Sequence, residues 1–335
     1  MTPEKASRHF PTVGRVDTAT PLRLGHIHDS WVVANAAGRW VIQRCNETVF
    51  ADLDAVMANM TLLCSECFPE LSPVVAETGA HVWRDNDGAA WRALPFVGGT
   101  VPTDTSDRSQ LRSLGAGLGA WHRRVADFDP NRLAVTIPRF HDPAARLDAL
   151  AAAVRLDIAG RAAAASPELE AIDASRWLAV EAQRMRAPTV PARVAHFDAK
   201  ADNMLLDALT GRVRAVVDLD TVMAGSWLWD VGDLVRSSGG PDDAGQPFDP
   251  TGFAALLDGY TSEAGDLLTA AEREGLTMAP LVATFEQAVR FLTDHLAGDV
   301  YYRVDRPGHN LERCRSQLIL LDSMVAHRSV MIRGQ

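Results

Sequence analysis

Hydrophobic and polar residues alternate in short runs through the first hundred positions, as they do in β-strands. The strand-like runs occupy residues 22–24, 30–34, 39–44, 81–84 and 90–97. Asn35-Ala36-Ala37-Gly38 and Asp85-Asn86-Asp87-Gly88 supply turns between neighbouring runs. Between positions 50 and 67, apolar side chains recur every three or four residues, which predicts a helix. The first part of the chain is therefore predicted to form a small antiparallel sheet with one helix.

The pattern changes at Gly98-Gly99, and we place a boundary between two lobes there. Beyond it the apolar spacing is mostly helical. The predicted helices cover residues 106–126, 143–165, 169–185, 253–264, 279–297 and 310–330. Residues 237–250 are rich in Gly, Pro and Asp and are predicted to form an exposed loop. We expect an α+β fold with an N-terminal lobe, residues 1–98, and a larger, mainly helical C-terminal lobe, residues 99–335.

One segment of the helical half does not follow the helical pattern. Short β-like pieces at residues 193–195, 204–206 and 213–219 alternate with polar residues between positions 192 and 220. Irregular polar segments held by a rigid scaffold commonly carry binding or catalytic residues. A functional site is therefore expected in this segment.

The segment contains His196-Phe197-Asp198-Ala199-Lys200-Ala201-Asp202-Asn203, and Asp218 follows fifteen residues after Asn203. It resembles the catalytic loop and metal-binding segment of the protein-kinase superfamily, whose His-x-Asp-x-Lys-x-x-Asn pattern it matches at every specified position. Phosphoryl transfer needs a hydroxyl aimed at the γ-phosphorus, and Asp198 is predicted to orient this hydroxyl and accept its proton. Lys200 supplies positive charge for the transferred group. The resemblance implies that Asn203 and Asp218 supply oxygen ligands for the Mg²⁺ that bridges the phosphates of ATP.

The resemblance extends to three neighbouring residues. His196 is grouped with the catalytic residues, and it is expected to fix the loop by hydrogen bonding. Asp220, two residues after Asp218 on the same strand face, is either a second metal ligand or a support. In the aminoglycoside phosphotransferase and choline kinase group, a similar Gly-x-x-x-x-Asp follows the metal aspartate, which implies that Asp230 braces the catalytic loop. Alternatively, Asp230 is a carboxylate favoured at a helix N-terminus, and both roles are compatible.

The first lobe contains candidate nucleotide contacts. The loop containing Gly25, His26, His28 and Asp29 is predicted to cover the phosphates with backbone N–H groups, and its two histidines are expected to be exposed. The residues expected to form the adenine hinge are Leu94, Phe96 and Val97.

A strand in this lobe departs from the kinase pattern. Residues 40–43 align with the Val-Ala-Ile-Lys strand of kinases, so Gln43 stands where a phosphate-binding Lys is expected. Val41 shares its face, and Arg44 is the alternative phosphate contact. Asn59 lies near the position of the Glu that pairs with this Lys. A Gln43–Asn59 pair is therefore expected to replace the ion pair.

These departures from the kinase pattern indicate a narrower group of kinases. The chain is similar to N-acetylhexosamine 1-kinases, bacterial members of the aminoglycoside-phosphotransferase-like fold, at residues 25–30, 41–46, 197–203, 217–225 and 302–313. The resemblance implies transfer of the γ-phosphoryl group of ATP, with Mg²⁺, to the anomeric hydroxyl of GlcNAc or GalNAc. The candidate sugar contacts are Asp294, Tyr301, Tyr302, Arg306, His309 and Asn310. Alternatively, residues 306–310 are a turn that enters a helix, with Asn310 as its N-cap.

Charge and composition limit the possible partners. Among the 335 residues, Lys and Arg number 33 against 43 Asp and Glu, and this net charge of −10 argues against nucleic acid as a general partner. The N-terminus lacks the apolar core of a signal peptide, and no apolar run approaches the roughly 20 residues that span a bilayer. Cys64 and Cys67 form a Cys-x-x-Cys without a second pair, so we interpret them as buried packing residues. A small-molecule acceptor and a reducing cytoplasm are expected, and the sequence does not indicate an oligomeric state.

Three other functions remain open. The first is a kinase of the same fold that acts on an aminoglycoside, choline or another amino-alcohol. The second is a nucleotide-binding pseudokinase that serves as a sensor or scaffold, for which the missing strand Lys is the only support. The third is a metal-dependent hydrolase using Asp198, Asp218 and Asp220, which the kinase-like first lobe disfavours.

Overall fold

The chain forms two compact units in a computed structural model, which describes residues 1–22, 27–102, 107–240, 242 and 244–333. Unit 1 consists of Met1–Gly98, Asn131–Pro138 and Leu219–Met223. Unit 2 consists of Gly99–Pro130, Arg139–Asp218 and Ala224–Gln335. Unit 1 thus includes two short segments from later in the chain, which a division into residues 1–98 and 99–335 does not anticipate.

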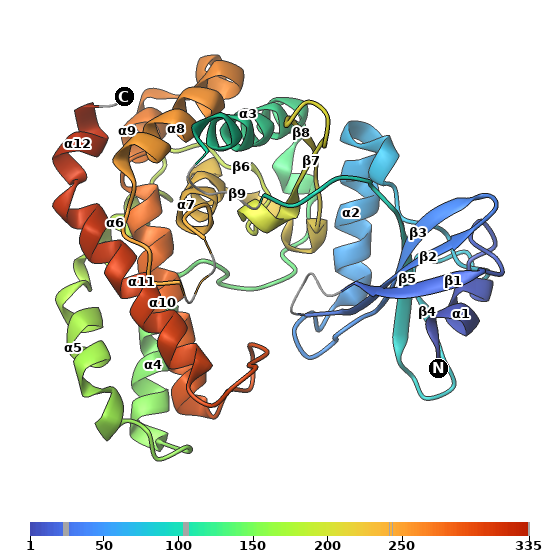
Figure 1. The fold of residues 1–335 in the computed structure, drawn as a ribbon, viewed down its shortest axis with the longest axis horizontal. Helices are drawn as coiled ribbons and strands as arrows, with labels where there is room; N and C mark the ends of the chain where they lie inside the picture. The colour runs from blue at the N-terminus through green and yellow to red at the C-terminus, as the bar shows by residue number, and fades with distance from the viewer. Residues whose placement is uncertain (23–26, 103–106, 241, 243, 334–335) are drawn as a thin grey trace. The chain divides into compact units, whose positions relative to one another are not determined.

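Unit 1 contains a five-stranded antiparallel sheet in the order β1-β2-β3-β5-β4, drawn in blue and cyan in Figure 1. The helix α2 stands beside this sheet (Figure 1). The strands are β1 (Thr18–Leu22), β2 (Asp29–Asn35), β3 (Gly38–Arg44), β4 (Trp83–Arg84) and β5 (Ala90–Pro95), and the helices are α1 (Pro3–Ala6) and α2 (Leu53–Cys67).

The two faces of this sheet differ in chemistry because successive side chains on a strand point to opposite sides. One face packs into an apolar core, and the other carries Ser30, Gln43 and Arg92. These three polar residues lie on adjacent strands, since Ser30 is opposite Gln43 and Gln43 is opposite Arg92 in the strand register. The core contains Phe10, Val33, Ile42, Val74, Trp91 and Ala93.

Asn59 of α2 joins the two later segments of unit 1. Its amide Nδ2 donates to the carbonyls of Ala134 at 2.8 Å and Val222 at 3.1 Å, and its Oδ1 accepts the Ala134 N–H at 2.8 Å. The prediction that Asn59 pairs with Gln43 is therefore wrong. The buried Asn59 amide forms its hydrogen bonds with backbone groups instead. The bond to the Val222 carbonyl connects the segment Leu219–Met223 to α2 within unit 1.

Unit 2 is mainly helical. The helix α10 packs against α11, α7 and α4, and α3 packs closely against α8 (Figure 1). A Cβ at Gly115 of α3 would lie 1.9 Å from the Leu256 carbonyl oxygen, so glycine is required for this close approach. The helices are α3 (Arg108–Val125), α4 (Pro143–Leu156), α5 (Ser166–Ala174), α6 (Trp177–Arg184), α7 (Trp227–Ser237), α8 (Pro250–Ala264), α9 (Ala270–Gly275), α10 (Ala279–Ala297), α11 (His309–Ala326) and α12 (Arg328–Arg333).

Four short strands interrupt the helices near the predicted site. The strands β6 (Arg193–Ala195) and β9 (Met223–Gly225) form one pair, and β7 (Met204–Leu206) and β8 (Val213–Val216) form an antiparallel hairpin. The strand predicted over residues 213–219 therefore ends at Val216. Asp218 has a φ of 67°, so the chain leaves the extended conformation before Asp220 and the two aspartates do not share a strand face.

Several helix predictions need correction. The Ala-rich helix predicted over residues 143–165 ends at Leu156, because Asp157 is left-handed with a φ of 37°. The helix predicted over residues 169–185 is two helices, α5 and α6. In the first lobe, the strand predicted at 22–24 begins earlier, at Thr18, and its last two predicted residues lie outside the described part of the chain.

Within the described residues, none of the helices combines the length and apolar character needed to cross a bilayer. Cys64 is buried and Cys67 is partly buried, and neither forms a disulfide. The part of the chain that the structure describes also contains no cluster of three His, Cys, Asp or Glu side chains suited to a metal ion. The packing interpretation of the Cys-x-x-Cys agrees with these observations.

Candidate active site

The backbone before Asp198 is held by one buried carboxylate. Asp230, in the first turn of α7, accepts the backbone N–H of His196 at 2.8 Å and that of Phe197 at 2.7 Å. Its Oδ2 also lies 3.0 Å from Nε2 of His122, whose other ring nitrogen contacts the Tyr260 hydroxyl at 2.9 Å. Asp230 thus contacts the loop directly and is itself fixed by a buried histidine on α3.

Phe197 requires this support because its φ is 64°, a left-handed conformation that a bulky residue rarely adopts. The ring packs against the backbone of Gly225, where an added Cβ would lie 2.1 Å from a ring atom. His141 contributes from another direction, since its Nε2 donates to the Phe197 carbonyl at 2.8 Å. The loop therefore depends on Asp230, Gly225 and His141, of which only Asp230 was predicted from sequence.

The three polar residues of the loop meet at Asp198. Lys200 Nζ donates to Asp198 Oδ2 at 2.7 Å, and Asn203 Nδ2 donates to the same oxygen at 2.9 Å and to the Asp198 carbonyl at 2.8 Å. The Asp198 side chain remains 29% exposed, so it is open to a ligand. Burial would raise the pKa of Asp198, but Lys200, His196 and Asn203 together hold this pKa below its usual value. The carboxylate is therefore ionised at neutral pH.

Lys200 is held in its charged form. Burial would lower its pKa, but the carboxylates of Asp198, Asp218 and Asp233 raise this pKa above its ordinary value. His196 is fully buried, and its Nε2 donates to the Val217 carbonyl at 3.1 Å while its Nδ1 accepts the Asp198 N–H at 3.3 Å. Both ring nitrogens thus bond backbone groups, and His196 orders the loop instead of facing a reactant.

Asn203 and Asp218 lie at the same end of the β7–β8 hairpin. Met204 is opposite Val216, and the Val217 N–H donates to the Asn203 carbonyl at 2.9 Å. Since Asn203 directs its Nδ2 at Asp198, its Oδ1 points to the other side of the amide. Asn203 thus offers an amide oxygen and Asp218 an exposed carboxylate, and this donor set suits Mg²⁺, so the residues present fit the ion.

A cation lies among aromatic rings in the same unit, and sequence analysis did not identify it. The Arg290 guanidinium is centred 5.5 Å from the Tyr302 ring, 5.8 Å from the Tyr301 ring and 5.8 Å from the Phe140 ring. Its Nη1 donates to Gln287 Oε1 at 3.0 Å, and Gln287 Nε2 donates to the Tyr302 hydroxyl at 3.2 Å. We call these residues, Phe140, Gln287, Arg290, Tyr301 and Tyr302, the Arg290 cluster.

The Arg290 cluster contacts the catalytic loop through an aromatic ring. Burial would lower the pKa of Arg290, but the two tyrosines, Glu286 and Asp198 raise it, so the guanidinium stays charged. Burial raises the pKa of Tyr302 to about 12, against the opposing effect of Arg290, and the phenol stays protonated. The Phe140 ring meets the Phe197 ring edge to face at 6.1 Å.

Two residues predicted to bind the acceptor instead shape the loop that carries the tyrosines. The Asp294 carboxylate accepts the N–H groups of Val300, Tyr301 and Tyr302 at 2.9, 2.7 and 2.9 Å. Asn310 Nδ2 donates to Asp294 Oδ2 at 2.8 Å, and Asn310 Oδ1 accepts from Arg313 at 3.1 Å. The prediction of Asp294 and Asn310 as acceptor ligands is therefore wrong.

The other two candidates near α11 lie in a turn. Arg306 is exposed, and its Nε donates to Glu312 at 2.9 Å. His309 is buried, and its Nδ1 accepts the Asp305 N–H at 3.3 Å. This agrees with the alternative of a helix-entry turn, although the N-cap position is Gly308, with a φ of 80°, and not Asn310.

Gln43 contacts a cation that sequence analysis also did not identify. Arg92 Nε donates to Gln43 Oε1 at 2.8 Å, and Gln43 Nε2 donates to Ser30 Oγ at 2.9 Å. The Arg92 guanidinium forms two hydrogen bonds with Asp220, at 2.6 and 2.8 Å. Both Asp220 oxygens are thus bound to arginine, and the prediction of Asp220 as a metal ligand is wrong.

The remaining nucleotide candidates lie in unit 1. Gly25 and His26 lie outside the described residues. The expectation that His28 is exposed is wrong, since its side chain is 5% exposed and its Nε2 contacts Asp220 at 2.7 Å. Asp29 and Arg44 are exposed and lie opposite each other where β2 begins and β3 ends, whereas Val41, Leu94, Phe96 and Val97 are half-buried.

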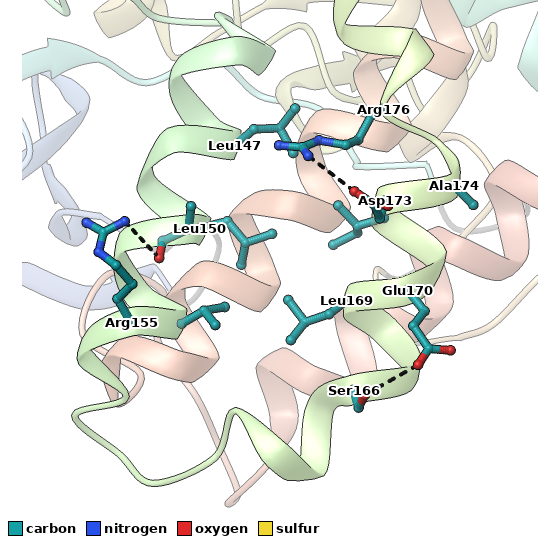
Figure 2. Close-up of a pocket in the computed structure, with 12 residues that line it drawn as sticks. Leu147, Leu150, Arg155, Ser166, Leu169, Glu170, Asp173, Ala174 and Arg176 are labelled. Atoms are coloured by element: carbon teal, nitrogen blue, oxygen red, sulfur yellow. Dashed lines mark hydrogen bonds and ion pairs between the residues drawn. The ribbon is translucent and has the colours of Figure 1, made fainter.

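An open depression of about 710 Å³ lies elsewhere in unit 2, between α4 and α5. Figure 2 shows Leu147 and Leu150 of α4 across from Leu169 of α5, with Arg155 and Glu170 at the edge. None of the predicted site residues lines it.

The α+β fold and the Asp198, Lys200 and Asn203 constellation define a phosphotransferase of the kinase-like class. Among solved structures, the chain is similar to an aminoglycoside phosphotransferase from Alicyclobacillus acidocaldarius, with 13% identity, a TM-score of 0.65 and coverage of 95% of this chain and 92% of that chain. It is also similar to a choline kinase from Cryptosporidium parvum, with 13% identity, a TM-score of 0.59 and coverage of 94% and 90%. An amicoumacin kinase in complex with AMP-PNP and Ca²⁺ has 14% identity, a TM-score of 0.60 and coverage of 90% and 87%. These similarities confirm the predicted kinase-like fold.

The sequence profile of the Phosphotransferase enzyme family (APH) matches residues 18–267. The chain belongs to this family, and it is a phosphotransferase. The predicted relationship to the aminoglycoside phosphotransferase and choline kinase group is confirmed at this level, and the scaffold and hydrolase alternatives are no longer needed.

Proposed function

We propose that the chain transfers the γ-phosphoryl group of ATP to a hydroxyl of a neutral amino sugar, with Mg²⁺ as the metal. The acceptor is N-acetylglucosamine or N-acetylgalactosamine, and the product is its 1-phosphate, as the resemblance to N-acetylhexosamine 1-kinases implies. The observation that carries the acceptor class is the Arg290 cluster, which places a cation among aromatic rings and contacts the residue before Asp198 through the Phe140–Phe197 ring pair.

The chemical step follows from the residues of the catalytic loop. Asp198 orients the acceptor hydroxyl and takes its proton as the hydroxyl oxygen bonds to the γ-phosphorus. The bond from the γ-phosphorus to the bridging oxygen of the β-phosphate breaks, and ADP leaves. Lys200, held 2.7 Å from Asp198, places positive charge beside the transferred group.

Asn203 and Asp218 would hold the metal ion, which would neutralise phosphate charge when bound. The AMP-PNP and Ca²⁺ in the amicoumacin kinase structure support a nucleotide and a divalent ion as partners of this fold. Val41 and Leu94, opposite each other on the polar face of the sheet, and the segment with Phe96 and Val97 are proposed to contact the nucleotide base. Dependence on ATP and four free cysteines support a cytoplasmic setting.

The Arg290 cluster argues against a cationic acceptor. An aminoglycoside or choline needs carboxylates or open aromatic faces to bind its positive charge. Here the faces of Phe140, Tyr301 and Tyr302 already lie near a guanidinium, which repels a second cation. A neutral sugar can instead accept hydrogen bonds from Arg290 and the protonated Tyr302 phenol and pack against Tyr301, which is 43% exposed.

The test is ADP release with Mg·ATP and six acceptors: GlcNAc, GalNAc, glucose, galactose, kanamycin and choline. Asp198→Asn serves as the inactive control. We expect turnover on an N-acetylhexosamine that exceeds turnover on the matching hexose and is lost in the control. Turnover confined to kanamycin or choline would contradict the acceptor class, and absence of turnover on all six would contradict the assigned sugar.

A further inference from the structure

Arg92 forms a buried ion pair in unit 1. Its side chain is 1% exposed and the Asp220 side chain is 2% exposed. The planar guanidinium binds both carboxylate oxygens, and its Nε donates to Gln43 on the neighbouring strand. A two-point arginine–carboxylate pair fixes both orientation and distance, which a single lysine contact does not. The position of Asp220 is therefore strongly determined by β5.

Asp220 has a second hydrogen-bond partner, His28. The Asn46 N–H donates to Nδ1 of His28 at 3.0 Å, so Nδ1 is unprotonated and the proton lies on Nε2. Nε2 then donates to Asp220 Oδ2 at 2.7 Å. The carboxylate is thus held from the start of β2 and from β5, at sequence separations of 192 and 128 residues.

The Arg92–Asp220 ion pair differs in its residues from the ion pair found in the first lobe of protein kinases. In protein kinases, a lysine of the third strand pairs with a glutamate of the adjacent helix. In this chain those two positions are Gln43 and Asn59, and Asn59 bonds Ala134 and Val222 instead. The positive charge lies one strand away on Arg92, and the carboxylate comes from the segment that follows Asp218.

Asp218 has an uncommon backbone conformation. Its φ of 67° lies in the left-handed region, which is less favourable for aspartate than the right-handed or extended regions, so contacts made by its neighbours help to hold it there. Leu219 alone separates Asp218 from Asp220, and Leu219–Thr221 forms a 3₁₀ turn. An anchor at Asp220 therefore restricts the backbone at Asp218 as well.

We propose that Arg92 is a positioning residue for the metal site, which acts through Asp220 to hold Asp218 in its metal-binding conformation. This inference depends on the proposed role of Asp218 in binding Mg²⁺. In this chain the Arg92–Asp220 ion pair holds the backbone that carries Asp218. Arg92 thus supplies the positive charge that a strand lysine supplies in protein kinases.

The test measures binding of a fluorescent ATP analogue by the full chain as Mg²⁺ is varied, with thermal stability recorded for each variant. Arg92→Gln and Asp220→Asn are expected to raise the Mg²⁺ concentration at half-saturation by about tenfold or more. Arg92→Lys, which keeps the charge and removes the two-point contact, is expected to give a smaller rise and provides a variant if Arg92→Gln does not fold.

Glu272→Gln is the matched control, because Glu272 is also buried and paired with an arginine, Arg193 at 2.7 Å, in a part of unit 2 outside the metal site. It should lower thermal stability without changing the Mg²⁺ dependence. The exchange variant Gln43→Arg/Arg92→Gln moves the guanidinium to the directly opposite strand position and should restore much of the Mg²⁺ response.

Unchanged half-saturation in Arg92→Gln, Arg92→Lys and Asp220→Asn would overturn the proposal, as would an equal shift in Glu272→Gln. A wild-type chain whose nucleotide binding ignores Mg²⁺ would also overturn it. No acceptor is present in this assay, so failure of the sugar panel leaves its result unaffected.

Discussion

The Asp230 carboxylate accepts the backbone N–H of Phe197 at 2.7 Å and holds that residue at a φ of 64°. Phe197 immediately precedes Asp198, so this bond sets the direction in which the catalytic carboxylate leaves the chain. The bond is buried, and in a low-dielectric environment a carboxylate to N–H bond is strong. Part of the order of this loop therefore originates in α7.

Gly225→Ala is expected to disturb this arrangement, because the new Cβ would lie 2.1 Å from the Phe197 ring. Overpacking of this kind lowers the free energy of unfolding by about 1–3 kcal/mol. We expect turnover to fall as well, since a displaced Phe197 moves Asp198. Denaturant unfolding and ADP release measure the two effects. Gly239→Ala, where a Cβ meets nothing within 4 Å, is the control and should be near neutral.

Asp198→Asn is expected to lower turnover by about 10²–10⁴-fold, since an amide does not take the acceptor proton. Folding and ATP affinity should stay close to wild type. ADP release and calorimetric ATP binding test these two parts separately. Asp202→Asn removes an exposed carboxylate from the same loop and should leave turnover unchanged. Near-normal turnover in Asp198→Asn would remove Asp198 from the mechanism.

Asp218→Ala is expected to abolish Mg²⁺-dependent nucleotide binding, because it removes the only charged ligand of the proposed metal pair. Calorimetry with Mg·ATP and with metal-free ATP separates the contribution of the metal to nucleotide affinity from the contribution of the adenine base. Asp207→Ala removes a carboxylate from the loop of the same hairpin, where Asp207 bonds Thr210, and serves as the control. Wild-type Mg·ATP affinity in Asp218→Ala would refute the metal assignment.

Arg290→Gln is expected to weaken sugar binding and to reduce the discrimination against cationic acceptors. Loss of the guanidinium removes both a hydrogen-bond donor and the positive charge among Phe140, Tyr301 and Tyr302. We expect the KM for N-acetylhexosamine to rise by about tenfold, equivalent to one lost charged hydrogen bond. Steady-state kinetics on the sugar and on kanamycin measure the change. The exposed Arg176→Gln is the control.

Glu286→Gln is expected to change the pH dependence of stability. Burial would raise the pKa of Glu286, but His141, Arg290 and Arg146 lower it, so the folded value lies below the unfolded value of about 4.3. The ionised carboxylate therefore stabilises the fold above that pH, and its contribution is lost as the pH falls towards the folded pKa. The Tm of the variant should be lower than that of wild type at pH 7, and the gap should narrow below about pH 4.3. A gap independent of pH would contradict this.

The local sequence pattern was sufficient to predict many of the helices and strands and the central residues of the candidate site. The helices α2, α3, α8, α10 and α11 and the strands β2 and β3 lie within or close to their predicted ranges. The predicted site residues Asp198, Lys200 and Asn203 lie within six positions of one another, and their side chains meet in the structure as this spacing predicts. The Ala-rich segment is the clearest error: its alanines favour helix over most of residues 143–165, but the helix ends at Leu156, where Asp157 adopts a left-handed conformation.

By itself the sequence determined the class of chemistry, because a phosphoryl-transfer loop is built from residues that are close along the chain. Tertiary structure alone decided which charges organise that loop. Arg92 reaches Asp220 across 128 positions, and Arg290 reaches Phe140 on an unrelated segment. Such pairs leave no periodic signal, since each residue looks ordinary within its own strand or helix. Their roles arise from burial, which strengthens a charge interaction only after the fold has brought its partners together and excluded water.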